Sequence, residues 1–198
     1  MKKYSRLADA FTPMAKGMNS EYANQNAYDA ISVHGGSGFI MEYKSQRLYR
    51  DARIFSIYEG TTQLQVVAAV RYITNGTYLN IIKEMAQEEV GDDMKALKAR
   101  VEKLIPLYEE AVNKVKEDGN QDEHDFLARR LYDMTADIIM SLLIIRDANE
   151  APELFAKSAN VYVRAAEEEV TGHAAYVKAF NASDLDAFRA EETEETEA

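Results

Sequence analysis

One acidic side chain, Glu59, lies between Tyr58 and Gly60 in the part of this sequence that is richest in residues capable of chemistry. Thr61 and Thr62 follow it directly, and threonine is a residue type that begins helices. The free N–H groups and positive potential of a helix N-terminus favour anionic or polar ligand groups. A carboxylate among apolar residues loses hydration and becomes a better proton acceptor, so Glu59 is a candidate general base.

The same residues also have a purely structural interpretation. Glu59 could precede a helix N-terminus only because negative charge is favoured there. Arg50 and Asp51 could form an ordinary ion pair. The three histidines are isolated along the chain, without a second ligand at metal-binding spacing, so we expect no metal site.

A glycine-rich turn, His34-Gly35-Gly36-Ser37-Gly38-Phe39, precedes this segment. Three glycines in four positions indicate a backbone that needs positive φ or is approached closely by another group. A Gly-Gly-x-Gly pattern alone is weak evidence for a ligand, because most such turns bind none.

The elements around these residues are predicted to be helices, and the fold class is all-α, an arrangement of antiparallel helices. No run of alternating polar and apolar residues indicates a strand. We expect one helix from Thr12-Pro13 to about Val33, with Gly17 as an unfavourable residue inside it, and a short helix over residues 42–52. Thr62-x-x-Gln65 is a capping-box pattern, and it predicts a helix that runs to Asn75-Gly76.

The later part of the chain is predicted to form three longer helices. An apolar stripe over residues 97–115 contains Pro106, which should kink or split its helix. Gly119-Asn120 predicts a turn, residues 127–145 carry the clearest stripe, and Pro152 begins a third helix. Three tyrosines on the apolar faces are expected in the core: Tyr108, Tyr132 and Tyr162.

Charge divides the chain into two segments. Residues 1–80 hold 9 Lys and Arg against 6 Asp and Glu (+3), whereas residues 81–198 hold 14 against 28 (−14). We expect a border near Asn75-Gly76 or Val90-Gly91-Asp92, giving a unit at 1–80, an acidic helical unit at 81–190 and a disordered acidic tail at 191–198.

Composition excludes several functions. The net charge of −11 argues against a nucleic acid as the main partner, because phosphate binding needs clustered Lys and Arg. The absence of cysteine excludes disulfides, thiolate zinc sites, iron–sulfur clusters and a cysteine nucleophile. The most apolar run, Ile138–Ile145, is far shorter than the ~20 residues that span a bilayer. We expect a soluble protein of the bacterial cytoplasm without a membrane span.

Residues 5–75 resemble the C-terminal helical domain of the acyl-CoA dehydrogenases. The run RDARIFSIYEGTTQLQ, residues 50–65, follows that family's pattern R-D-A-x-I-x-x-I-Y-E-G-T-x-x-x-Q, and HGGSGF resembles its flavin-site turn. The match is specific because many positions agree in one register. The acidic second segment resembles, by composition only, a helical region appended in one bacterial branch of the family.

The resemblance implies a reaction and a partner. Family members oxidise an acyl-CoA thioester to the 2,3-enoyl-CoA: a carboxylate removes the α-proton, and the β-hydrogen leaves as hydride to FAD. An electron-transferring flavoprotein usually reoxidises the flavin. Glu59 falls on the position of the base, and its backbone N–H falls where it would bond the thioester oxygen.

The resemblance also assigns the binding residues. Gly60 and, more loosely, Arg71 fall on substrate-side positions. Ser32 replaces the glutamine usual at its position, so one flavin contact is expected to be lost or mediated by water. The positions that contact FAD in relatives, often across a subunit boundary for the glycines, are Ser32, Gly35, Gly36, Thr61 and Gln63.

Relatives carry further domains before this region, so we expect this chain to be the C-terminal portion of a longer, homo-oligomeric enzyme. Alone it should neither hold FAD tightly nor turn over. The alternative is a helical oligomerisation or interaction module that does no chemistry. A third hypothesis gives residues 92–190 a membrane-surface or docking role, although their acidity argues against anionic lipid.

Overall fold

The computed structural model describes residues 2–188, and their only regular secondary structure is helical, which confirms the predicted all-α class. The predicted acidic tail, residues 191–198, lies outside the described residues. Among residues 2–188, no helix has both the length and the apolar character needed to cross a membrane.

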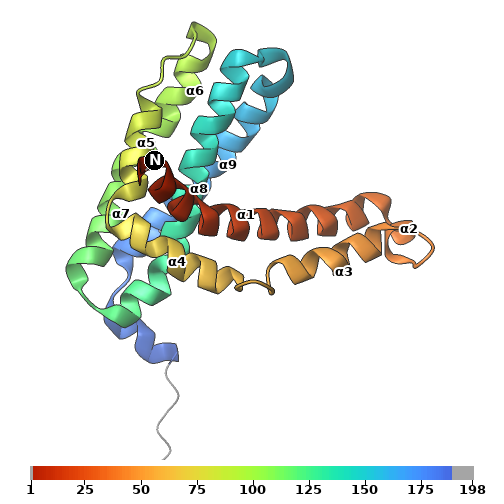
Figure 1. Cartoon of the computed structure of the whole chain (residues 1–198), viewed down its shortest axis with the longest axis horizontal. Helices are drawn as coiled ribbons and strands as arrows, with labels where there is room; N and C mark the ends of the chain where they lie inside the picture. The colour runs from red at the N-terminus through yellow and green to blue at the C-terminus, as the bar shows by residue number, and fades with distance from the viewer. Residues whose placement is uncertain (1, 189–198) are drawn as a thin grey trace, which may run out of the picture.

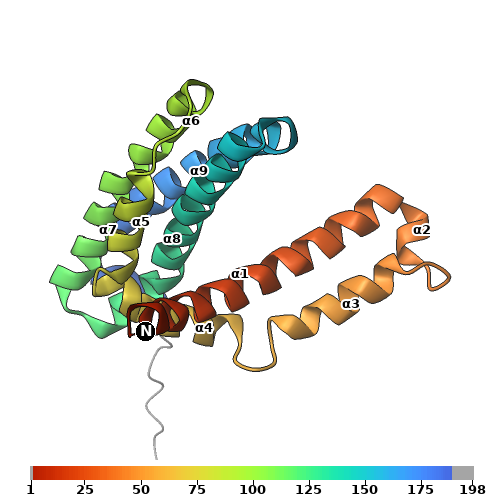
Figure 2. The ribbon, with the colours of Figure 1, turned by 45° about the horizontal axis from the view of Figure 1, so that its top comes forward.

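The chain forms a helical bundle from which a two-helix arm projects (Figure 1). The two long helices of the arm are the later part of α1 (Lys2–His34) and α3 (Ser45–Phe55), which runs back along α1; the short α2 (Gly36–Phe39) lies between them at the tip. The bundle contains α4 (Thr62–Thr74), α5 (Thr77–Ala86), α6 (Asp92–Glu102), α7 (Leu104–Asp118), α8 (Gln121–Glu150) and α9 (Pro152–Ala179), followed by the 3₁₀ helix η1 (Ala182–Phe188). Figure 2 shows that only the first part of α1 packs on the bundle.

The first helix differs from the prediction, because α1 begins at Lys2 and Pro13 lies inside it. Proline removes one backbone donor from a helix interior. Hydroxyl groups supply other donors nearby: Thr12 Oγ1 donates to the Ala8 carbonyl at 2.8 Å, and Tyr78 Oη donates to the Ala10 carbonyl. Thr12-Pro13 is a local signal for a helix N-terminus, but contacts with the bundle stabilise a helix that continues through it.

The remaining boundaries follow the predictions more closely. The short arm helix begins at Ser45 and ends at Phe55, three residues later than predicted at each end. The stripe over residues 97–115 is split at Lys103, so Pro106 is the third residue of α7. The turn at Gly119-Asn120 is confirmed, as is the start of α9 at Pro152.

The core is centred on α8, which packs against α9, α7, α6 and α4. Tyr108 and Tyr132 are fully buried, as predicted, whereas Tyr162 is only half-buried and hydrogen-bonds Asp137. The buried cluster continues through α4 to Ala10 and Met14 of α1. The apolar packing is therefore continuous from the base of the arm into the acidic helices.

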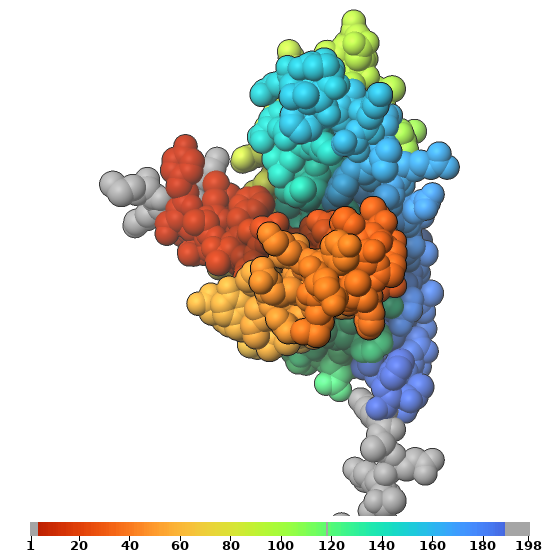
Figure 3. Space-filling model, turned by 90° about the vertical axis from the view of Figure 1, so that its right-hand side faces the viewer, coloured from red at the N-terminus to blue at the C-terminus, as the bar shows by residue number. Residues whose placement is uncertain are grey.

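The arm, by contrast, leaves large apolar side chains in solvent. Its tip carries Val33, Phe39 and Met41 at 85%, 76% and 86% exposure. Figure 3 looks along the arm toward the bundle, and the tip stands in front of the other elements. Such an extended, solvated face is typical of a surface that other polypeptide covers.

Candidate functional site

The candidate base lies in a tight turn between α3 and α4. Glu59 has φ 51°, and it is the only non-glycine residue with positive φ among the described residues. Gly60 follows with φ 91°, and the N–H of Thr62 closes the turn on the Ser56 carbonyl at 3.1 Å. A left-handed glutamate is uncommon and marks a backbone that its surroundings hold in place.

Side chains of α1 and α4 hold this turn through its carbonyl oxygens. Lys16 Nζ of α1 donates to the carbonyls of Phe55 at 2.7 Å and Gly60 at 2.6 Å. Ser20 Oγ, one turn further along α1, also donates to Phe55 O at 3.0 Å. Gln65 Nε2 of α4 lies 3.3 Å from Gly60 O and 3.4 Å from Glu59 O.

The capping of α4 differs from the predicted capping box by one residue. Thr61 is the N-cap, and its Oγ1 accepts from the Leu64 N–H at 3.3 Å. Thr62 instead donates its hydroxyl to Glu21 Oε1 of α1 at 2.6 Å. Glu59 and Gly60 both have positive φ, so the chain turns one residue before the predicted helix start. Gln65 therefore lies near the carbonyls of the turn and not near the backbone N–H of the N-cap residue.

The apolar surroundings expected for Glu59 are absent from the described chain. Glu59 is exposed, and the neighbouring Ile57 and Tyr58 are 47% and 45% exposed. A hollow of about 430 Å³ lies beside the turn, and its lining includes Glu59, Lys16, Asn19 and Tyr58. The carboxylate is therefore hydrated unless something else closes this hollow.

The glycine turn lies at the far end of the arm, between α1 and α2. Gly35 has φ 60°, and a Cβ added to Gly35 or Gly36 would meet no atom within 4 Å. This bare backbone can be approached closely by a ligand. Gly38 is required by packing instead, because a Cβ there would lie 2.6 Å from the Ile31 carbonyl oxygen.

The predicted site residues form two groups that the structure keeps apart. Ser32, Gly35 and Gly36 lie at the arm tip, and Ser32 Oγ donates to the Tyr28 carbonyl at 3.5 Å. The other group flanks Glu59, where Gly60 and Thr61 lead into α4 and Gln63 is exposed in its first turn. Along α1, Ser32 lies 16 residues beyond Lys16, whose Nζ binds the Gly60 carbonyl, and this stretch of helix is about 24 Å long.

Two further predictions concern arginines. Arg71 lies in the last turn of α4, exposed, with its guanidinium 6.0 Å from the Tyr72 ring centroid. It is thus two to three helical turns from the Glu59 turn. Arg50 and Asp51 form an exposed pair at 3.6 Å, as the structural interpretation predicts.

Sequence reasoning missed Lys16 and Gln65 as parts of the site. Lys16 lies 39 and 44 residues before the carbonyls it binds, a separation that no local motif spans. One signal is present in the sequence: Lys16 is the only Lys or Arg between positions 7 and 43. The spacing of Gln65 from Thr62 fits a capping box, so the sequence predicts a capping role for it instead.

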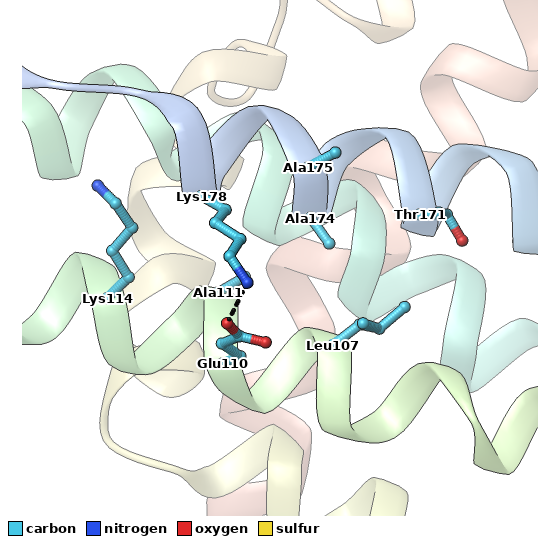
Figure 4. A pocket seen from close by; sticks show the side chains of 8 residues that line it. All are labelled: Leu107, Glu110, Ala111, Lys114, Thr171, Ala174, Ala175 and Lys178. Atoms are coloured by element: carbon cyan, nitrogen blue, oxygen red, sulfur yellow. Dashed lines mark hydrogen bonds and ion pairs between the residues drawn. The ribbon is translucent and has the colours of Figure 1, made fainter.

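A second hollow lies between α7 and α9, away from all predicted site residues (Figure 4). It measures about 400 Å³, and small residues such as Ala111, Ala174 and Thr171 form much of its wall. Lys178 reaches across from α9 to Glu110 of α7, with Nζ 3.0 Å from Oε1. Within residues 2–188, no group of three or more His, Asp or Glu side chains is arranged to hold a metal ion.

Comparison with protein families gives two adjoining matches. Residues 2–73 match the model described as "Acyl-CoA dehydrogenase, C-terminal domain". Residues 74–185 match the model described as "Acyl-CoA dehydrogenase C terminal". Together the two models cover nearly all of the described chain.

Individual relatives agree with these matches. A subunit of the caffeyl-CoA reductase-Etf complex of Acetobacterium woodii is 54% identical over 52 residues, which are 26% of this chain and 14% of that protein. An acyl-CoA dehydrogenase family protein of Porphyromonas gingivalis has a solved structure that is 36% identical, with TM-score 0.54, covering 58% of this chain and 98% of that one. Bacillus anthracis acyl-CoA dehydrogenase complexed with FAD is 21% identical, with TM-score 0.63, over 89% of this chain and 34% of that one, and shows the fold alone.

Proposed function

Because the chain belongs to the acyl-CoA dehydrogenase family, we propose that it supplies the catalytic base of a flavin-dependent acyl-CoA dehydrogenase. The observation that carries this proposal is the turn at Glu59. Its glutamate has a costly left-handed backbone, and three side chains from two helices bind the turn carbonyls. Backbone strain that is held so firmly is a feature of functional sites.

In the proposed reaction, Glu59 removes the α-proton of an acyl-CoA thioester, and the product is the 2,3-enoyl-CoA. The Glu59 backbone N–H donates to the thioester oxygen, which stabilises the negative charge that develops as the proton leaves. Gly60 and Arg71 are assigned to the substrate side. FAD, when bound, accepts the β-hydrogen together with its electron pair.

Two groups of described residues fit a flavin nucleotide. Gly35 and Gly36 offer uncovered backbone, and Ser32 offers a short hydroxyl beside them. Thr61 and Gln63 lie at the N-terminus of α4, where free N–H groups favour phosphate or polar ring atoms. Because α3 separates the groups, we propose that each flavin is bound by one group from one copy of the chain and by the other group from a second copy. This arrangement implies a homo-oligomer.

The rest of the enzyme is also part of the proposal. The chain spans 14% of its Acetobacterium relative, and the Glu59 turn is exposed. We propose that further segments of a longer bacterial cytoplasmic enzyme close over Glu59, and that this chain alone neither holds FAD tightly nor turns over. The relative's place in an Etf complex supports an electron-transferring flavoprotein as electron acceptor. We further propose a role in fatty acid metabolism. The division into units 1–80 and 81–190 remains a proposal.

The test is Glu59→Gln in the enzyme that contains this chain. Removing a general base should slow flavin reduction by at least about 100-fold, measured as flavin bleaching with a panel of straight and branched acyl-CoA thioesters. FAD content should stay unchanged. Glu42→Gln, an exposed glutamate in the turn before α3, is the matched control and should behave as wild type. If Glu59→Gln retains activity within a few-fold, the assignment is wrong and the non-catalytic helical module is favoured.

A further inference from the structure

We infer that Lys16 is the positioning residue of the candidate base: its ammonium group fixes the turn that presents Glu59. This inference rests on the proposed function. In this role Lys16 acts through the backbone of the turn. The two acceptors of Lys16 lie on either side of the loop, at the end of α3 and directly after Glu59.

The hydrogen-bond geometry makes Lys16 the strongest anchor of the turn. Its bonds measure 2.7 and 2.6 Å, whereas those of Gln65 measure 3.3 and 3.4 Å. Bonds from an ammonium group to carbonyl oxygens are charge-assisted and stronger than amide bonds. Ser20 reaches only the Phe55 carbonyl, so the short bond to Gly60 O is supplied by Lys16.

The position of Lys16 explains why the cation is well suited to this task. Phe55 is the last residue of α3, and carbonyls at a helix C-terminus lack intrahelical donors and favour positive charge. The stem of Lys16 is half-buried on α1, and its Nζ lies 5.9 Å from the centre of the Tyr58 ring. The ammonium is thus held by acceptors on one side and an aromatic ring on another.

The consequence for catalysis follows from the strain at Glu59. A left-handed glutamate returns to an ordinary conformation if the carbonyl after it is released. Movement of a reacting group by about 1 Å can lower a rate by about 100-fold. The loss should therefore affect kcat, because substrate-binding groups elsewhere would be unchanged.

The first measurement is made on the 198-residue chain itself. The intraresidue HN–Hα nuclear Overhauser effect of Glu59 reports the turn conformation by NMR, because positive φ brings these two protons closer together than negative φ does. Lys16→Met, which keeps the stem but removes the ammonium, should weaken this Overhauser effect. Lys157→Met, at an exposed lysine of α9, should leave it unchanged. Lys16→Gln, too short to reach both carbonyls, serves the same purpose if the methionine variant does not fold.

The second measurement is made on the enzyme containing this chain. We expect Lys16→Met to lower kcat by 10- to 100-fold with KM within about threefold, and Lys16→Arg to recover most of the loss. An unchanged intraresidue HN–Hα Overhauser effect of Glu59 in Lys16→Met, or a kcat within threefold of wild type while Glu59→Gln is inactive, overturns the inference. If Glu59→Gln is active, the proposed function fails, and the Overhauser effect still decides whether Lys16 fixes the turn.

Discussion

The hydroxyl group of Tyr132 occupies the space that a side chain at Gly17 would need. A Cβ on Gly17 would lie 2.2 Å from Tyr132 Oη, which hydrogen-bonds the carbonyls of Pro13 at 3.2 Å and Met14 at 3.0 Å. The contact joins the centre of α8 to α1 at the base of the arm. The glycine that looks unfavourable in the sequence is therefore required for close packing.

Gly17→Ala should lower the free energy of unfolding. Alanine favours a helix by about 1 kcal/mol over glycine, but the overpacking against Tyr132 costs about 1–3 kcal/mol and disrupts two buried hydrogen bonds. We expect a net loss of about 1–2 kcal/mol in urea unfolding followed by circular dichroism.

The matched control is Gly172→Ala on α9. A Cβ at Gly172 would meet no atom within 4 Å, and the position is exposed. This substitution should raise the free energy of unfolding by about 0.5–1 kcal/mol, because only helix propensity and chain entropy change. The same effect in both variants would contradict the packing role of Gly17.

Glu59→Gly should stabilise the chain while removing the proposed base. At φ 51° a glutamate is strained by about 1–2 kcal/mol; glycine removes this penalty but adds freedom to the unfolded chain, which offsets about 0.5–1 kcal/mol of the gain. We expect an increase of up to about 1 kcal/mol in the free energy of unfolding by urea denaturation. An increase in the free energy of unfolding would mean that folding stability is not the reason why position 59 holds a glutamate.

Glu89→Gly provides the comparison for that variant. Glu89 is an exposed residue in the connection between α5 and α6, and its φ is not positive. Glycine there only adds freedom to the unfolded chain, so a loss of about 0.5–1 kcal/mol is expected. A loss of similar size in Glu59→Gly would show that the left-handed backbone carries no strain.

The helices could be predicted wherever local signals decide the structure. Gly119-Asn120 breaks the chain because Asn120 caps α8, and Pro152 begins α9 because its first position needs no N–H. Pro13 gives the same local signal as Pro152 but lies inside α1. Its surroundings include the hydroxyls of Tyr78 and Tyr132, which come from residues more than 60 positions away. Such distant donors have no signature in the local sequence.

The candidate site could be predicted in part for the same reason. Glu59 and Thr61 belong to a contiguous motif, so their proximity follows from the chain itself. Lys16 reaches the turn only because α3 folds back along α1, and no local pattern records this. The exposure of Glu59 was also missed, because the apolar neighbours in the sequence point into solvent rather than around the carboxylate.

A half-buried cluster of acidic and tyrosine side chains joins α1, α8 and α9. Tyr162 Oη donates to Asp137 Oδ1 at 3.1 Å and lies 3.2 Å from Tyr22 Oη. The pKa of Asp137 is raised from its ordinary value to about 6, chiefly by burial; the hydrogen bond from Tyr162 opposes this shift, and the nearby carboxylates of Asp133 and Glu169 add to it. Asp137 is therefore a better proton acceptor in the folded chain than in the unfolded one.

The pH dependence of stability follows from that difference. Because the pKa of Asp137 is raised on folding, the folded chain binds the extra proton between about pH 4 and pH 6, and the free energy of unfolding falls as pH rises through this range. The contribution is on the order of 2 kcal/mol. Asp137→Asn stays neutral and can still accept from Tyr162, so it should be more stable than wild type at pH 7 by about that amount and equal to it near pH 4. Urea unfolding at several pH values measures this, with the exposed Glu168→Gln as control. A difference between Asp137→Asn and wild type that does not change with pH would show that Asp137 is not protonated on folding.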